Sequence, residues 1–202
     1  MHLEPGSQMK AKAKSAAQTG RTGQRQWLVM KFGGSSVSSA RCWELIREQA
    51  ERVIDSGQFG MIVVSALSGV TNLLSCMAEE AVAERRSALL EDIKQRHDNL
   101  LQQLDVGVSP EYEHHWRDLA KMNGQETFPL VPDQRAVLLS FGELLSSALG
   151  KQVLEQAGLP VVLQDARELL QAAQADVDTR WAMYEYLASR SFSPTNGTGE
   201  EA

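Results

Sequence analysis

The chain has 202 residues, 43% of them hydrophobic, and a formal net charge of −6. This length is enough for one domain with a sizeable core. Residues 1–26 hold five basic residues and one glutamate, so the rest of the chain carries a net charge near −10. Such an acidic body does not attract nucleic acid through its net charge, and no apolar run approaches the length needed to cross a bilayer. We therefore expect no nucleic-acid partner and no membrane partner.

Both ends of the chain differ in composition from its middle. Residues 1–26 are expected to be a disordered basic leader, because no apolar stretch follows the basic residues as it does in a secretory signal. A nucleic-acid-binding or membrane-binding arm is the alternative. Residues 191–202 are polar and are also expected to be disordered. Cys42 and Cys76 fall in helical patterns and are expected to be free, mostly buried thiols, which favours a cytoplasmic location.

The first predicted unit is a strand, a turn and a helix. Residues 26–32 predict the strand, and glycine and serine residues follow it directly. Residues 39–57 then show apolar side chains at helical spacing. Either Ser38 or Ser39 can cap the start of this helix, and Gly57 suits its end.

The second predicted unit repeats this order. Residues 59–66 form a nearly continuous apolar run, which suits a strand buried on both faces. The polar turn 67–72 follows, and a helical pattern then runs from about residue 73 to residue 104 and can break into two helices. Residues 105–132 are rich in loop-forming glycine and proline, with a short helix expected near 111–122.

The third predicted unit begins with a helix over residues 134–158, which Asp133 can cap and a glycine ends. Residues 160–164 predict a strand, and Asp165 is expected to cap the helix after it. A last helical pattern covers residues 177–190. The alternation of strand, turn and helix implies parallel strands joined by right-handed crossovers.

The turn after the first strand has the residue types of an anion site. Lys31 closes the strand, and Gly33 and Gly34 let the backbone adopt positive φ and approach a ligand closely. Ser35 and Ser36 add hydroxyl and backbone N–H donors. Ligands of such sheets bind beyond the carboxyl ends of the strands, where the lysine would neutralise a transferring phosphoryl group. The alternative is a tight turn with an edge lysine.

The turn after the second strand is similar. Ser65 closes that strand, Gly69 loosens the loop, and Ser68, Thr71 and Asn72 offer short polar groups. Simple N-capping by Thr71 or Asn72 is the alternative. Two such turns at one edge of the sheet favour a shared polar pocket.

A glycine and a carboxylate interrupt the apolar helix predicted for residues 134–158. Gly142 costs a helix about 1 kcal/mol relative to alanine. Glu143 lies among leucines and a phenylalanine, so its carboxylate either belongs to a solvated stripe or faces a substrate ammonium. The helical spacing permits both.

Four segments stand in a distinctive order along residues 27–170. They read VMKFGGSSV (29–37), VVSALSGVTNLL (63–74), SFGELLSSAL (140–149) and DARELL (165–170). Together they resemble the signatures of aspartokinases, which belong to the amino-acid kinase superfamily. The Thr-Asn pair and the Ser-Phe-Gly-Glu run favour aspartokinases over the glutamate, acetylglutamate and uridylate kinases of that superfamily.

The resemblance implies ATP-dependent phosphorylation of the β-carboxylate of L-aspartate to 4-phospho-L-aspartate, the first step towards lysine, threonine and methionine. ATP and Mg²⁺ would be the cofactors. Carried over position by position, Lys31 would meet the transferring phosphoryl group. The phosphates would be cradled by Gly33, Gly34 and Ser35.

The resemblance also implies a fold, a three-layer α/β/α sandwich with a mostly parallel sheet over residues 27–190. In this fold, Ser65 and Thr71 would hold substrate or phosphate oxygens, and Glu143 would bind the aspartate ammonium.

One part of the family pattern is missing. Aspartokinases continue with a segment of roughly Gly-Arg-Gly-Gly-Ser-Asp and then regulatory ACT domains, and residues 171–202 contain neither. The chain therefore resembles the aspartate-side portion of a kinase domain without its nucleotide-binding half, and its parent could be a bifunctional aspartate kinase/diaminopimelate decarboxylase. The alternatives are a catalytically incomplete fragment, a non-catalytic interaction or regulatory module, and another small-molecule kinase. Partner chains would be a homo-oligomer or a missing C-terminal portion.

Overall fold

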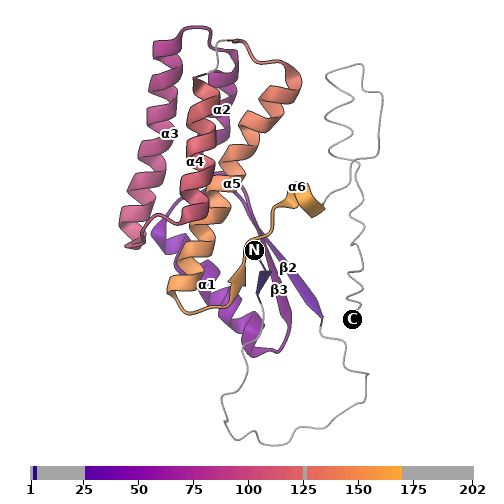
Figure 1. Ribbon diagram of the computed structural model, residues 1–202. Helices are drawn as coiled ribbons and strands as arrows, with labels where there is room; N and C mark the ends of the chain where they lie inside the picture. Colours follow the sequence, from indigo (N-terminus) through magenta and orange to yellow (C-terminus); the bar gives the residue numbers. More distant parts are fainter. Residues whose placement is uncertain (1, 4–25, 125–126, 170–202) are drawn as a thin grey trace, which may run out of the picture. The chain divides into compact units, whose positions relative to one another are not determined.

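A computed structural model describes residues 2–3, 26–124 and 127–169 of the chain (Figure 1). Most of the described residues are helical. The elements in chain order are β1 (His2–Leu3), β2 (Trp27–Phe32), the 3₁₀ turn η1 (Gly34–Val37), α1 (Ala40–Asp55), β3 (Phe59–Val64), α2 (Val70–Glu79), α3 (Ala83–Leu104), α4 (Pro110–Asn123), α5 (Pro132–Gln156), β4 (Val161–Val162) and α6 (Ala166–Leu169).

The sheet has four strands in the order β2-β3-β1-β4. β2 and β3 are parallel, with Trp27 opposite Phe59 and Phe32 opposite Val64, as the alternation of strand and helix predicts. β1 is antiparallel to both β3 and β4. The sheet is therefore mixed, and the expected mostly parallel sheet is wrong for two of its three pairings. β1 lies between β3 and β4, which run in the same direction. Its residues 2–3 belong to the leader that the sequence predicts to be disordered.

Helix α1 connects β2 to β3 and packs on the sheet through Trp43, Ile46, Ala50 and Val53, all buried. These side chains recur at helical spacing, which places them on one face of the helix. The Ser39 hydroxyl accepts a hydrogen bond from the Cys42 amide, which confirms one of the two predicted caps.

Helices α2 to α5 pack together beyond one end of the sheet, and the long α5 runs from these helices down to the strands (Figure 1). The predicted break in the 73–104 pattern is confirmed, because α2 ends at Glu79 and α3 begins at Ala83. The predicted cap of α5 is wrong. Pro132 is already helical, so Asp133 lies inside the first turn, and the Val131 amide donates to Gln134 Oε1 instead.

Helix α5 is the central helix of the core. By length and composition alone it could cross a membrane, but more than half of that apolar stretch is buried inside the protein. Its side chains join one continuous hydrophobic core with the sheet and the other helices. The fully buried members from α5 include Leu138, Leu145, Leu149 and Leu154.

Among the described residues of 2–163, helices cover only one face of the β2–β3 pair. Ile62 and Val64 point into the core shared with α1 and α5. On the other face, Trp27, Val29 and Val63 are 49%, 60% and 43% exposed. The described residues of 2–163 thus form two layers, and the expected third layer is not seen among them, because none of their helices lies on that second face.

The chain divides into two compact units at residue 163. In the second unit, the structure describes residues 164–169. There Asp165 Oδ1 accepts a hydrogen bond from the Arg167 amide at 2.8 Å at the start of α6, which confirms the predicted cap. The helix predicted over 177–190 and the disordered end predicted over 191–202 lie outside the described residues.

Candidate functional site

The two glycine- and serine-bearing turns leave the same edge of the sheet. β2 ends at Phe32 and β3 ends at Val64, and these two residues pair directly. The pairing continues one step further, because the Ser65 amide donates to the Phe32 carbonyl at 3.0 Å. The turns that begin at residues 33 and 65 are therefore neighbours, as the sequence predicts for parallel strands.

Lys31 lies one residue before the end of β2, on the face of the sheet that also carries Trp27 and Val29. Its ammonium bends toward the turn, because a Cβ built on Gly33 would lie 3.7 Å from Lys31 Nζ. Lys31 is exposed, and no ion pair to it is found among the described residues. An unneutralised cation beside a glycine can meet an anionic ligand without breaking an existing pair.

The glycines of the first turn serve a different purpose from the one expected. The positive-φ glycines of the described residues are Gly57, Gly69 and Gly158, so the predicted positive φ at Gly33 and Gly34 is wrong. Gly34 is instead a site of close approach, because a Cβ there would lie 2.9 Å from the Ala66 carbonyl oxygen. The absence of a side chain lets the backbones of the two turns touch.

The second turn places its polar residues on the surface. Gly69, at φ +80°, immediately precedes α2, and no side chain caps this helix. The capping alternative for Thr71 and Asn72 is therefore wrong, since both lie inside the first turn of α2 and both are exposed. The hydroxyl of Thr71 has no hydrogen-bond partner within the described ranges and remains available to a ligand. Ser65 is half-buried between the two turns.

Helix α5 reaches the same point through its glycine. A Cβ on Gly142 would lie 2.7 Å from the Cβ of Ala66, so the helix packs against the second turn more closely than any other residue would allow. This approach explains a glycine in the middle of a buried helix. The next residue, Glu143, is exposed, and its Oε1 accepts a hydrogen bond from the Ala66 amide at 3.4 Å. The carboxylate is thus solvated, as one alternative predicts, and it also borders the turn. The other alternative, a carboxylate that faces a substrate ammonium, stays a prediction.

Ala66 is the meeting point that sequence reasoning missed. The first turn touches its carbonyl at Gly34, α5 touches its side chain at Gly142, and Glu143 binds its amide. A small residue two positions after the end of β3 was the available signal. The importance of Ala66 can be recognised only once Gly34 and Gly142, from distant segments, are known to contact it.

The structure brings all seven predicted site residues to this edge of the sheet or to the segments that border it. The residues are Lys31, Gly33, Gly34, Ser35, Ser65, Thr71 and Glu143. Ser35 is exposed, and its carbonyl accepts from the Cys42 thiol at 3.8 Å. Cys42 is half-buried and Cys76 is exposed, so the thiols are free as predicted but the expected burial is wrong.

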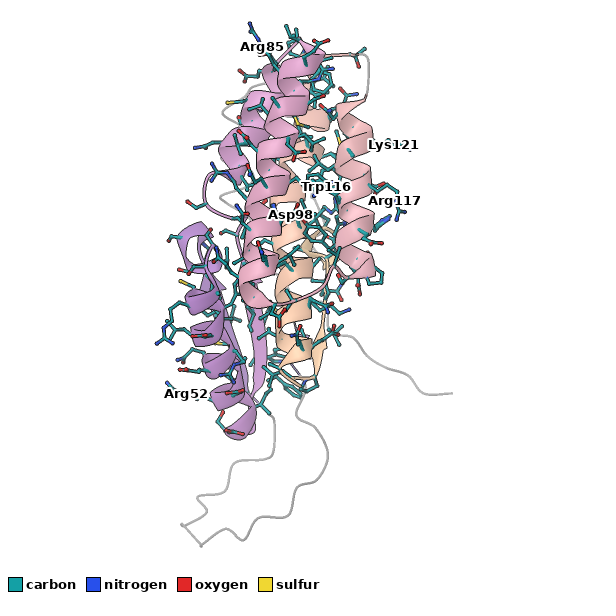
Figure 2. All side chains as sticks on the ribbon, turned by 90° about the vertical axis from the view of Figure 1, so that its left-hand side faces the viewer. Arg52, Arg85, Asp98, Trp116, Arg117 and Lys121 are labelled. Carbon is teal, nitrogen blue, oxygen red and sulfur yellow. The ribbon has the colours of Figure 1, made fainter. Side chains whose placement is uncertain are left out.

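Two hollows in the described part of the chain lie away from this edge. One of them, of about 470 Å³, lies between α3 and α4. Asp98, Trp116 and Arg117 line this hollow, whereas Lys121 of α4 does not (Figure 2). Within the described ranges, no three His, Cys, Asp or Glu side chains gather to hold a metal ion.

The comparison with protein families matches residues 26–194 to the model described as the amino acid kinase family. Among curated proteins, the aspartokinase of Chlamydia trachomatis is 33% identical over 145 residues, which are 71% of this chain and 31% of that protein. Lysine-sensitive aspartokinase 3 of Escherichia coli is 28% identical over 148 residues, 71% of this chain and 32% of that protein. The chain thus spans about a third of the length of these relatives.

A bifunctional relative also matches. Bifunctional aspartokinase/homoserine dehydrogenase 2 of E. coli is 30% identical over 165 residues, 79% of this chain and 20% of that protein. The decarboxylase fusion considered from the sequence has no support in these matches.

Solved structures agree on the fold. Aspartokinase III of E. coli in complex with aspartate and ADP superposes with a TM-score of 0.56 at 24% identity, covering 66% of this chain and 30% of that one. The same enzyme in complex with lysine and aspartate gives a TM-score of 0.56 at 25% identity, over 67% and 30% of the two chains. The sheet edge, its two turns and the family match over most of the sequence lead to one conclusion: the chain belongs to the amino acid kinase family.

Proposed function

We propose that the edge of the sheet at Ala66 binds L-aspartate and takes part in ATP-dependent phosphorylation of its β-carboxylate. The supporting observation is that two polar turns and a carboxylate meet at Ala66, with a cation that has no ion pair among the described residues beside the first turn. Lys31 Nζ lies beside Gly33, the first turn touches Ala66 at Gly34, and Glu143 binds the Ala66 amide. The aspartokinases among the matched proteins agree with this assignment.

Each charge at this edge suits one part of the reaction. The reaction brings a carboxylate nucleophile to a phosphoryl group, and these two anions repel each other. ATP with Mg²⁺ would supply the phosphoryl group and part of the charge neutralisation. Lys31 would reduce the remaining repulsion, since electrostatic stabilisation is the main task in phosphoryl transfer.

The substrate would be held from the second turn and from α5. Glu143 would pair with the aspartate ammonium, and its exposed carboxylate is open to such a partner. Ser65 and Thr71 would donate their hydroxyls to substrate or phosphate oxygens. No described residue is assigned to Mg²⁺ or to the adenine, because no cluster of metal ligands is found in the described ranges.

The decisive test is phosphoryl transfer from Mg-ATP to L-aspartate by this chain, with the acyl phosphate trapped by hydroxylamine. We expect product from the wild-type chain and a loss of at least about 100-fold in Lys31→Ala. Lys121→Ala is the matched control, because Lys121 is exposed on α4, away from the sheet edge (Figure 2). Equal turnover in Lys31→Ala and wild type would remove Lys31 from the mechanism.

Substrate binding can be measured separately from turnover. Glu143→Gln keeps the size of the side chain but removes its charge. If Glu143 binds the ammonium, calorimetry should show an aspartate Kd that rises about 10- to 100-fold, as for the loss of a hydrogen bond between charged groups. An unchanged Kd would contradict the role of Glu143.

A non-catalytic interaction module is the second candidate, and the exposed apolar side chains on the face of β2 and β3 that carries Trp27 favour it. Trp27 and Phe59 stack there with ring centroids 5.0 Å apart, and Val29 and Val63 are largely exposed. Apolar patches of this kind mark surfaces that contact further protein. Folded chain that binds aspartate but forms no acyl phosphate, and that self-associates in sedimentation experiments, would favour this candidate over a self-sufficient kinase.

A further inference from the structure

The second turn is held by two side chains that the proposed reaction does not use. Ser68 is the residue just before Gly69, where the chain turns into α2. Its amide donates to the Ser38 hydroxyl at 2.7 Å. Its carbonyl accepts from Arg96 Nη1 at 3.0 Å. One exposed residue is thus bound on both sides by partners from distant parts of the sequence.

The chemistry of the serine fixes the direction of its hydrogen bonds. A backbone amide can only donate, so the Ser38 hydroxyl must accept from Ser68. Its single proton is then available to the Gly34 carbonyl, which lies 2.6 Å away. The hydroxyl therefore links the first turn to the second. This link lies next to the backbone contact at which a Cβ on Gly34 would lie 2.9 Å from the Ala66 carbonyl oxygen.

Arg96 supports the same residue from helix α3. A Cβ built on Gly69 would lie 3.1 Å from Arg96 Nη1 and 3.5 Å from its Cζ, so the guanidinium rests against this glycine. Gly69 has φ +80°, a conformation that a side chain would strain. Arg96 thus packs against Gly69, the residue that directly precedes α2.

We propose that Ser38 and Arg96 are positioning residues, which clamp Ser68 from both sides and so fix the second turn against the first. Thr71 follows Ser68 by three residues, in the first turn of α2. The clamp therefore sets the position of the Thr71 hydroxyl relative to Lys31 and the first turn. This consequence for substrate binding rests on the proposed function, whereas the immobilised turn does not.

Amide hydrogen exchange tests the clamp directly. The variants are Ser38→Ala and Arg96→Gln, both changes at sites that are not in the buried core. Loss of one such hydrogen bond should speed exchange of the Ser68 amide about tenfold. Arg96→Gln is the informative variant, because it leaves the Ser68 amide bond to Ser38 in place. Faster exchange in this variant means that the two bonds act together.

Matched controls separate the clamp from a general loss of stability. Ser56→Ala removes a serine hydroxyl bonded to a carbonyl at the far end of α1, and Arg52→Gln removes an exposed arginine near it (Figure 2). Neither control should change the exchange rate of the Ser68 amide. Ser38→Thr keeps a hydroxyl and should therefore show the slow exchange of the wild-type chain. Unchanged Ser68 exchange in both Ser38→Ala and Arg96→Gln would overturn the clamp.

Aspartate affinity then reports on the proposed function. We expect both clamp variants to raise the Kd for aspartate about tenfold. Faster exchange with an unchanged Kd would overturn the link to Thr71. A wild-type chain that fails to bind aspartate would contradict the proposed function, while the exchange rates would still decide whether the clamp exists.

Discussion

Helices α2 to α5 and the sheet edge at Ala66 are held together by different kinds of contact. Between the helices, large apolar side chains interlock, and Ile93, Leu119 and Leu138 are fully buried. Even the polar groups there are enclosed. His97 is fully buried, and Arg86 donates to the carbonyls of Glu80 and Ala81 at the junction of α2 and α3.

At the sheet edge, backbone atoms and small residues make the contacts. Gly34 and Gly142 approach Ala66 more closely than a side chain would permit. The charged and hydroxyl groups around them, on Lys31, Thr71 and Glu143, are exposed. Burial of apolar area stabilises the helices, whereas the edge contributes little burial and keeps its polar groups available to a ligand.

The comparison indicates that stability and chemistry are separated along the same helix. α5 contributes leucines to the core and a glycine followed by a carboxylate to the edge. Substitutions at the buried leucines of α5 should therefore mainly reduce stability, whereas a substitution of Glu143 should mainly reduce ligand binding. The four predictions below test this separation, from the largest expected change in stability to the smallest.

Leu145→Ala should have the largest effect. Leu145 is fully buried, and truncation of such a leucine costs about 2–5 kcal/mol, through lost burial and the cavity left behind. Urea denaturation measures this change in the free energy of unfolding. Leu45→Ala on α1 is the control, because Leu45 is 43% exposed and should change stability far less. Similar losses in the two variants would contradict the assigned core.

Gly142→Ala should have the next largest effect. The new methyl group would lie 2.7 Å from Ala66 Cβ, and overpacking of this kind costs about 1–3 kcal/mol, partly offset by about 1 kcal/mol of better helix propensity. It should also shift the Ala66 amide resonance by moving Glu143. Gly107→Ala is the control, since nothing lies within 4 Å of a Cβ there. A stabilised Gly142→Ala variant would show that α5 does not pack closely on the turn.

The buried side chain of His97 should make the stability of the folded chain depend on pH. Burial lowers the pKa of His97 in the folded chain and outweighs the hydrogen bond to the Ile93 carbonyl, which raises it. Nδ1 lies 2.8 Å from that carbonyl oxygen, so the neutral ring carries its proton on Nδ1. The unfolded chain then binds the proton more readily. Stability should be complete above the unfolded-state pKa of about 6.5 and should fall as the pH drops below it.

Urea midpoints at about pH 7.5 and pH 5.5 measure this effect. His97→Gln should reduce the difference between the two midpoints, whereas His114→Gln, at an exposed position, should leave it unchanged. A pH response that is the same in His97→Gln and wild type would show that other groups cause it.

Lys31→Ala should have the smallest effect on stability. Lys31 is exposed and belongs to no ion pair found within the described ranges, so its removal should change the free energy of unfolding by no more than about 0.5 kcal/mol. The same variant should lose phosphoryl transfer. A loss of several kcal/mol would mean that the lysine supports the fold, and its catalytic test would then need a charge-preserving arginine variant for comparison.

Much of this arrangement could be predicted from local sequence. The parallel β2–β3 pair, the Ser39 cap and the break between α2 and α3 follow from apolar periodicity and turn residues, which act over a few positions. The predicted site residues of the two turns share one edge because parallel strands bring their carboxyl ends together, whereas Glu143 reaches this edge from α5.

Other features depended on contacts between distant segments. Gly142 had an evident local cost without a local purpose, and Gly34 was expected to allow positive φ and the approach of a ligand. Both glycines instead allow close contact with Ala66. The insertion of residues 2–3 between β3 and β4 had no local signal, since two residues carry no periodic pattern. Ser38 was expected to act only as a possible cap, and its bond to Ser68 spans 30 residues.

The sequence closed the first two strands at Lys31 and Ser65, each one residue from the observed ends at Phe32 and Val64. By itself it determined the alternation of strands and helices after residue 26, the two turns and the family to which the chain belongs. These properties depend on side-chain periodicity and short motifs, which are local. The tertiary structure decided which glycines allow close approach, which polar groups remain exposed and which side chains hold the second turn. These properties depend on distances between segments that only the packed core brings together.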